Sequence, residues 1–360
     1  MNSHPRREGS PPFPVTPELL RRLPKAELHV HLDGSLRPET MIELAREYGK
    51  ELPAWEPEAL ARAMKAEDSA NLVEYLKSFE ITLSLMQTSE ALERIAYELA
   101  MDLSHHGVRY AEIRYSPVLN IKEGLPLTET VEAPLRGLKR AREEVGIHTQ
   151  VIICGIRNMD PETSRDLADL TVAFKNRGVV AFDLAGAEYN YPAKKHKDAF
   201  FTVINANMAA TIHAGEAYGA ESIHQALHYC RANRIGHGTR LFQDPELMQF
   251  VTDFRIPLEI CLTSNVQTGA VPSLEEHPLR LYFDRGIVVT LNTDNLLVSG
   301  TTPTQEYLAA HRHLGFSWEE LKELARMSFR SAFLHHHEKL KLLEEVERDM
   351  VELELEFGDA

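Results

Sequence analysis

Two apolar segments, TQVIICGI at residues 149–156 and GVVAFDLA at residues 178–185, decide the fold of this chain. Their runs of valine, isoleucine and leucine are typical of strands that are buried on both faces of a parallel sheet. The segment between them has helical periodicity. Similar strands are predicted at residues 26–32, 108–115, 209–214, 233–237, 257–262 and 286–292. Eight such strands joined by helical crossovers predict an α/β fold, a single (β/α)8 TIM barrel.

The chain between the first two strands is too long for one crossover helix, so residues 39–105 are expected to hold several helices. An insertion after the first strand lies at the C-terminal mouth of a barrel, where it can cover a pocket. Leu72, Tyr75, Leu76 and Phe79 have helical spacing within it. Such a stripe either packs a helix on the core or lines a pocket for a planar aromatic ligand, and both interpretations stay open. Extra helices are predicted after the eighth strand.

The composition limits the classes of function. The chain has 360 residues, of which 43% are hydrophobic, and this is ample for a large core. Its formal net charge of -15 makes it a poor candidate for binding nucleic acid, although a nucleoside, which has no phosphate, is not excluded. No apolar run approaches the length of a membrane span. The cysteines Cys154, Cys230 and Cys261 form no CxxC pair and are interpreted as buried residues in a reducing compartment, by default the cytoplasm.

The two ends of the chain differ in composition from the rest. Residues 1–16 are rich in proline and carry no secretory signal, so we expect a disordered leader there. The barrel is expected to occupy residues 17–350 as one domain. The sequence is strongly acidic from Glu344 onward, and residues 351–360 are expected to form a solvated acidic tail.

Three segments at predicted strand ends carry the candidate chemistry: ELHVHLD at 27–33, HAGE at 213–216 and NTDN at 292–295. His29 and His31 are two residues apart on a strand, so their imidazoles point to the same face. His213 and Asp294 end other strands, and strand ends meet at the mouth of a barrel. Three imidazoles and one carboxylate suit one divalent metal ion with room for a water molecule. A metal-dependent hydrolase is therefore the leading hypothesis.

Two further residues at strand ends are candidates for proton transfer. Glu216 lies three residues after His213 and could donate a proton to a substrate, or it could be a glutamate that stabilises a helix N-terminus. His237 ends the sixth strand between two glycines. It could abstract a proton from an activated water, stabilise the charge that develops there, act as a metal ligand, or be a structural histidine. Within the barrel, Glu112, Arg114 and Arg157 are expected to form a buried ion-pair network.

These motifs together resemble the adenosine deaminases of the amidohydrolase superfamily. The resemblance covers nearly all of residues 24–340 and includes LHVHLDGSLRPET, ERIAYE, RYSP, DLAG, HAGE, RIGHG and NTDN. It implies a (β/α)8 barrel with one zinc ion, bound by His29, His31, His213 and Asp294. The predicted strand at 178–185 lacks the lysine that bridges two metals in many amidohydrolases, which favours a single metal.

The resemblance also implies the reaction. Zinc would activate a water molecule that attacks C6 of adenosine, and 2′-deoxyadenosine is expected as a further substrate. Glu216 would donate a proton to the purine N1, and His237 would orient and deprotonate the water. Together with the ligand Asp294, these two residues make up the expected catalytic set. The products would be inosine and ammonia.

Four residues are expected to contact the nucleoside. By the resemblance, Asp33 would bind a ribose hydroxyl, His31 would lie beside the sugar, and the backbone of Gly186 would contact the purine edge. Asn295 stands where the animal enzymes have a second aspartate that is thought to hydrogen-bond purine N7. An amide donates without needing an added proton, so Asn295 is predicted to donate to N7, with a turn-stabilising role as the alternative.

Two alternative functions stay open at this point. One is deamination of a related compound: adenine, AMP or 6-amino-6-deoxyfutalosine. An anionic Asp33 argues against a phosphate, and free adenine would leave the ribose contacts unused. The other is a catalytically idle barrel that binds nucleosides, against which the presence of every chemical residue argues.

Overall fold

The computed structural model describes residues 13–66 and 71–358. Its centre is an eight-stranded sheet in which each strand pairs in parallel with the next, in the order β1 to β8. The strands are β1 (Lys25–His31), β2 (Val108–Tyr115), β3 (His148–Ile156), β4 (Val179–Ala185), β5 (Ala209–Ala214), β6 (Arg234–His237), β7 (Leu258–Ile260) and β8 (Val289–Leu291). The predicted barrel and its strands are confirmed, although β7 and β8 are shorter than the predicted segments 257–262 and 286–292.

The barrel closes between β8 and β1 near their C-terminal ends. The backbone N–H of His31 donates to the carbonyl of Asp294 at 2.7 Å, and the N–H of Asp294 donates to the carbonyl of His29 at 2.9 Å. This bridge places the residues just after β8 beside the end of β1. Closure of the barrel therefore brings the predicted metal donors from the two ends of the chain together.

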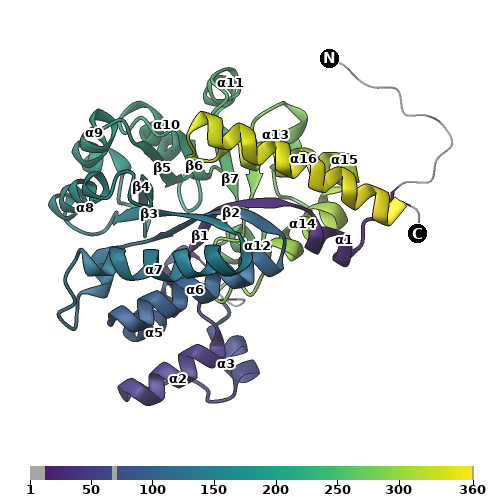
Figure 1. Cartoon of the computed structure of the whole chain (residues 1–360). Coiled ribbons are helices and arrows are strands. Elements are labelled where there is room, and N and C mark those ends of the chain that lie inside the picture. Colours follow the sequence, from purple (N-terminus) through teal and green to yellow (C-terminus); the bar gives the residue numbers. More distant parts are fainter. Residues whose placement is uncertain (1–12, 67–70, 359–360) are drawn as a thin grey trace, which may run out of the picture.

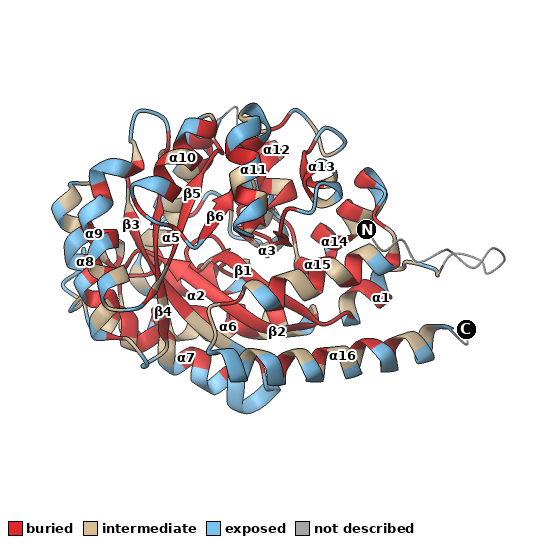
Figure 2. Cartoon of the chain, turned by 90° about the horizontal axis from the view of Figure 1, so that it is seen from above, coloured by how far each residue is buried: buried red, intermediate tan, exposed pale blue. Residues whose placement is uncertain are grey.

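Helices surround the barrel, burying one side against the strands and exposing the other (Figure 2). Those after β2 are η2 (Pro117–Asn120), α7 (Glu129–Val145), α8 (Pro161–Ala173), η3 (Ala193–His196), α9 (Lys197–Asn205), α10 (Ala220–His228), η4 (Leu241–Gln243), α11 (Pro245–Asp253), α12 (Leu262–Gln267), α13 (Leu279–Asp284), α14 (Pro303–Leu314), α15 (Trp318–Ser331) and α16 (His336–Gly358). None of the helices in the described part of the chain is both long and apolar enough to cross a membrane.

The insertion after β1 contains several helices, as predicted. They are α2 (Pro38–Tyr48), α3 (Pro57–Met64), α4 (Leu72–Tyr75), η1 (Leu76–Ser78), α5 (Phe79–Leu85) and α6 (Ser89–His105), and α2 and α3 project from the barrel in Figure 1. The stripe formed by Leu72, Tyr75, Leu76 and Phe79 does not belong to the main hydrophobic core. Leu72 and Tyr75 form a small hydrophobic cluster with Ala66 and Val298, separate from the main core. Since Val298 follows β8, this cluster lies against a loop at the barrel mouth.

Residues 13–16, the last part of the expected disordered leader, pack on the rest of the protein. Residues 1–12 of the predicted leader lie outside the described residues. The ring of Phe13 stacks on Trp318 with a centroid separation of 5.4 Å. The Thr16 side chain accepts a hydrogen bond from the backbone of Leu19 and so caps α1 (Pro17–Arg22).

The expected acidic tail is helical over residues 351–358, and most of these residues are exposed, as expected, while Leu353 is buried. These residues are the last part of α16, the long helix drawn in yellow in Figure 1. Val346, Met350 and Leu353 are buried along one side of this helix. Glu354 accepts hydrogen bonds from Trp318 and pairs with Lys322. Apolar residues at helical spacing within an acidic sequence therefore hold the helix on the barrel.

Candidate active site

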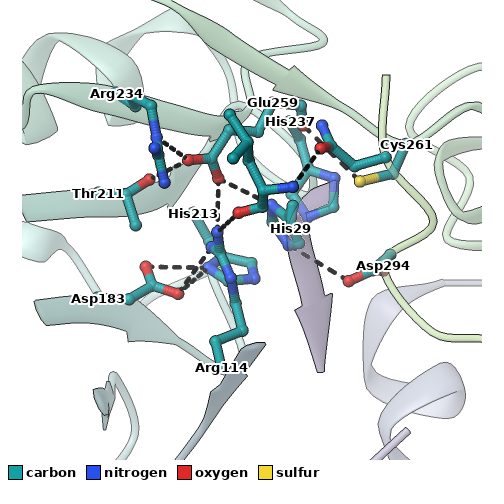
Figure 3. A network of polar contacts seen from close by, with 12 residues as sticks. His29, Arg114, Asp183, Thr211, His213, Arg234, His237, Glu259, Cys261 and Asp294 are labelled. Atoms are coloured by element: carbon teal, nitrogen blue, oxygen red, sulfur yellow. Dashed lines mark hydrogen bonds and ion pairs between the residues drawn. The ribbon is translucent and has the colours of Figure 1, made fainter. Parts of the chain in front are cut away.

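Four imidazoles and one carboxylate converge where β1, β5, β6 and β8 end, and Figure 3 shows four of these five side chains. Ligand atoms of His29, His213, His237 and Asp294 all lie within 4.8 Å of one another. His31 joins this group, because its Nε2 lies 3.1 Å from Nε2 of His213 and 3.4 Å from Oδ1 of Asp294. The structure thus brings together all four predicted metal donors and adds His237 to the same cluster.

Buried carboxylates hold the outer nitrogens of two imidazoles. Nδ1 of His29 lies 3.0 Å from Oε2 of Glu259, and Nδ1 of His213 lies 3.0 Å from Oδ2 of Asp183. In a neutral imidazole, Nδ1 then carries the proton and Nε2 turns its lone pair inward. Burial lowers the pKa of His31 and His213, so these rings are neutral, as metal ligands must be.

The donor set fits a divalent metal ion. Nε2 of His29 is buried without a hydrogen-bond partner, although it lies 3.3 Å from Oδ1 of Asp294. A buried lone pair next to a carboxylate and further imidazoles is unfavourable unless a cation lies between them. Nitrogen and carboxylate donors of this kind suit zinc and several other divalent transition metals.

Glu259 is a functional residue that the sequence analysis did not identify. Besides His29, its carboxylate accepts hydrogen bonds from Arg114 at 2.9 Å, Arg234 at 2.6 Å and Thr211 at 2.9 Å. Burial alone would raise the pKa of Glu259, but Arg114 and Arg234 hold it well below the usual range. The sequence feature that could have indicated Glu259 is an acidic residue inside a predicted strand that is otherwise apolar.

The predicted ion-pair network is confirmed for two of its three residues. Arg114 pairs with Asp183 at 3.1 Å as well as with Glu259, and Glu112 pairs with Arg234. Arg157 is not part of this network. Arg157 follows the end of β3, and its guanidinium donates instead to the backbone carbonyls of Tyr191 and His213.

Asp294 is held by a neighbour that the sequence analysis also missed. The Ser264 hydroxyl donates to its Oδ2 at 2.6 Å, which leaves Oδ1 facing His29 and His31. Asp294 itself has a φ of +62°, in the left-handed region that costs free energy for a non-glycine residue. Burial would raise the pKa of Asp294, but the neighbouring imidazoles of His29, His31 and His237 keep it below its usual value.

A chain of hydrogen bonds determines which nitrogen of His237 carries the proton. The backbone N–H of Leu279 donates to Nδ1 of His277 at 3.0 Å, so Nε2 of His277 carries a proton and donates to Oδ1 of Asn265 at 3.1 Å. The Asn265 amide nitrogen then donates to Nδ1 of His237 at 3.0 Å. A neutral His237 therefore has its proton on Nε2, which lies 3.6 Å from Oε2 of Glu216. Such a nitrogen has no free lone pair for a metal ion and acts as a hydrogen-bond donor.

Glu216 is a buried acid beside this donor. Burial, followed by the charge of Asp294, raises its pKa well above the usual value, so its carboxyl group holds a proton at neutral pH. The alternative role at a helix N-terminus does not fit, because α10 begins at Ala220 with Gly219 as its N-cap. The site thus combines metal donors with a protonated carboxyl group, which is the arrangement for metal-assisted hydrolysis with a general acid.

Comparisons with known proteins agree with this chemistry. A family model described as adenosine deaminase matches residues 24–349. The chain belongs to the adenosine deaminase family. The adenosine deaminase of Mycobacterium sp. (strain JLS) is 42% identical, and the match covers 92% of this chain and 96% of that protein. The probable adenosine deaminase of Dictyostelium discoideum is 41% identical over 92% of this chain, which spans only 43% of that protein.

Among solved structures, the adenine deaminase of Arthrobacter aurescens matches with a TM-score of 0.84 and 29% sequence identity, covering 90% of this chain and 98% of that one. As a member of the adenosine deaminase family, the protein is an enzyme, a hydrolytic deaminase of a metal-dependent family. The histidine and aspartate cluster at the barrel mouth could hold the metal ion of such an enzyme.

The residues expected to contact substrate in this adenosine deaminase family member lie near the same mouth. Oδ1 of Asp33 is buried without a hydrogen-bond partner, 3.9 Å from Nδ1 of His31, and burial raises the pKa of Asp33 to about 7. Gly186 follows β4 with a φ of +90° that disfavours any side chain. Asn295 is buried, and its Oδ1 also lacks a partner. Buried polar atoms without partners are expected where a polar ligand binds.

Proposed function

We propose that the protein hydrolyses adenosine and 2′-deoxyadenosine to the corresponding inosine compounds and ammonia. One observation carries this proposal: the buried carboxyl group of Glu216 lies 3.6 Å from Nε2 of His237, beside the cluster of imidazole nitrogens and Asp294. Water adds its oxygen at C6, and the 6-amino group leaves as ammonia. Of the two protons of the water, one goes to the leaving amino group and the other replaces the proton that Glu216 gives to N1, so the reaction needs no other co-substrate. This activity suits a role in purine salvage.

We further propose that the metal is a single zinc ion held by His29, His31, His213 and Asp294. The tautomer of His237 supports this choice of four from the five donors, because its inner nitrogen carries a proton. Its role then differs from the expected proton abstraction. His237 is assigned as a donor that orients the attacking water and stabilises negative charge on its oxygen.

The chain's own residues supply the remaining chemistry. A bound divalent ion supplies Lewis acidity that activates water at neutral pH. Glu216 gives its proton to the purine N1, so the ring accepts the electron pair of the attack without building negative charge. Asn295 donates to N7, and Asp33 and the backbone of Gly186 bind the ribose and the purine edge.

The choice of adenosine over related 6-aminopurines rests on Asp33. Its buried oxygen needs a partner that a ribose hydroxyl can supply and that free adenine cannot. A phosphate there would face a carboxyl group instead of a cation, which disfavours AMP. The three buried free thiols, Cys154, Cys230 and Cys261, suit a reducing compartment, and we place the enzyme in the cytoplasm.

The test is a substrate panel assayed for ammonia release, with metal analysis of the same preparation. Adenosine and 2′-deoxyadenosine should give the highest kcat/KM, and the preparation should contain one zinc ion per chain. A higher kcat/KM for adenine or 6-amino-6-deoxyfutalosine would assign a different substrate to the same chemistry. Deamination by a preparation fully stripped of metal would refute the mechanism.

A further inference from the structure

One buried carboxylate binds the backbone of the loop that carries Glu216. Glu188 follows β4, and its Oε1 accepts the N–H of Gly215 at 2.7 Å. Its Oε2 accepts the N–H groups of Glu216 at 3.0 Å, Ala217 at 2.5 Å and Tyr218 at 2.9 Å. Four consecutive backbone donors of one loop therefore converge on a single side chain, and none of the chemistry assigned so far uses it.

The loop needs this carboxylate because it has no regular structure of its own. It runs from the end of β5 at Ala214 to the start of α10 at Ala220, so its N–H groups have no ladder or helix partners. Gly215 has a φ of +75°, which helps turn successive N–H groups toward one point. Two carboxylate oxygens offer about four lone-pair sites, enough for all four donors, whereas a glutamine side chain offers only one oxygen.

Residues near Glu188 join its loop to β5 and to the loop that follows β5. The Arg157 guanidinium donates to the carbonyl of Tyr191, on the same loop as Glu188, at 3.0 Å, and also to the carbonyl of His213 at the end of β5. The rings of Tyr189 and Tyr218 lie 5.8 Å apart across the two loops. The loops after β4 and β5 are therefore joined at three places.

We propose that Glu188 is a positioning residue of the deamination: by binding the backbone of residues 215–218, it aims the carboxyl group of Glu216 at the purine N1. This inference rests on the proposed function, in which Glu216 is the proton donor. Glu188 does not touch the substrate and acts only through Glu216. Its charge has a second effect in the same direction, since burial, Asp294 and then Glu188 raise the pKa of Glu216 and keep it protonated.

The test compares Glu188→Gln with a matched control, Glu221→Gln, on the exposed side of α10. For metal-loaded enzyme, we expect Glu188→Gln to lower kcat for adenosine by about 100-fold, the scale of a misplaced general acid, with KM changed by less than about threefold. The control should keep kcat. In a Glu216→Gln background, Glu188→Gln should cause almost no further loss, because both substitutions remove the same step.

A second measurement does not depend on activity. Backbone amide exchange of the peptide that spans 214–219 should be at least about tenfold faster in Glu188→Gln than in the wild type or the control, because glutamine keeps only one accepting oxygen and places an NH2 donor against the N–H groups of the loop. This measurement separates the inference from the proposed function. If neither the wild type nor any variant deaminates adenosine but exchange is faster in Glu188→Gln, the proposed function fails, and the contact between Glu188 and the loop is still supported.

Three results would overturn the inference. They are an unchanged kcat in folded, metal-loaded Glu188→Gln, an equal loss of kcat in the Glu216→Gln background, or a loss of activity that follows metal content. If Glu188→Gln does not fold, Glu188→Asp replaces it. This variant keeps the charge but shortens the reach, and we expect about a tenfold loss of kcat with the same dependence on Glu216.

Discussion

The hydroxyl of Tyr75 lies 2.7 Å from Nδ2 of Asn295, joining the helical insertion after β1 to the loop after β8. The same hydroxyl lies 2.7 Å from Oγ of Ser299. An amide nitrogen carries two hydrogens, so Asn295 can donate one to Tyr75 and keep the other for a purine N7. On its other side, Oδ1 of Asn295 packs against Gly34, where a Cβ would lie 1.6 Å away. Tyr75 and Gly34 together determine which way the amide faces.

We therefore expect substitutions of Asn295 and Tyr75 to weaken the hydrogen bond to the purine N7. Asn295→Ala should lower kcat/KM for adenosine by about 10- to 100-fold, the value of one buried hydrogen bond, and should barely change kcat/KM for 7-deazaadenosine. Tyr75→Phe removes only the hydroxyl and should cause a smaller loss with the same substrate pattern. If wild-type enzyme turned over 7-deazaadenosine as well as adenosine, the assignment of Asn295 would be wrong.

Glu216→Gln should lower kcat for adenosine by about 10²- to 10⁴-fold while metal binding persists, because an amide cannot give a proton to N1. In the wild type, the protonated form of Glu216 is the active one, and its pKa is raised by burial and by Asp294. Activity should therefore persist through neutral pH and fall as the pH rises through this raised pKa. Steady-state rates and metal content measured across pH check this, and normal turnover by Glu216→Gln would contradict it.

The burial of Glu216 should also lower the free energy of unfolding at neutral pH. Its pKa is higher in the folded protein than in the unfolded chain, so its contribution to stability is fully present below the unfolded pKa and is lost as the pH rises. At neutral pH, metal-free Glu216→Gln should therefore unfold at a higher temperature than the wild type, by a margin equivalent to about 1 to 3 kcal/mol. The gain should disappear at acid pH. Thermal unfolding at two pH values provides the comparison.

Asn265→Asp should reverse the tautomer of His237 with little change of shape. A carboxylate accepts a hydrogen bond from Nδ1, so the proton would leave Nε2, the nitrogen that faces Glu216. We expect kcat to fall by about 100-fold or more, while the metal content is unchanged. The ring ¹⁵N chemical shifts of His237 report the tautomer directly. A variant with full activity and a reversed tautomer would refute the role given to this chain of hydrogen bonds.

Ser264→Ala removes one hydrogen bond from the oxygen of Asp294 that faces away from His29 and His31. Residues that orient metal ligands typically contribute 10- to 100-fold in metal affinity, and we expect a loss in that range. Competition with a chelator gives the affinity, and readdition of zinc should restore kcat. Ser328→Ala, at a buried serine far from the site whose hydroxyl donates to the carbonyl of Leu324, is the control.

The sequence contained the fold and the principal donors because both follow from local periodicity. Strand segments that are buried on both faces are apolar throughout, and a two-residue spacing places His29 and His31 on one face whatever the rest of the chain does. Parallel strands end at one mouth, so His213 and Asp294 could be added from their positions alone. The helix at the acidic end of the chain was not predicted, because its few apolar residues are spaced among many charged ones.

The tertiary structure decided what each of those residues can do. Glu259 reaches His29 and Asn295 reaches Tyr75 across more than 200 positions of sequence, and no local pattern encodes such a pair. The proton of His237 and the direction of Glu216 depend on partners that become neighbours only when the barrel closes. Residue types and their spacing specify which groups gather at the mouth; protonation and orientation arise from hydrogen bonds between distant segments.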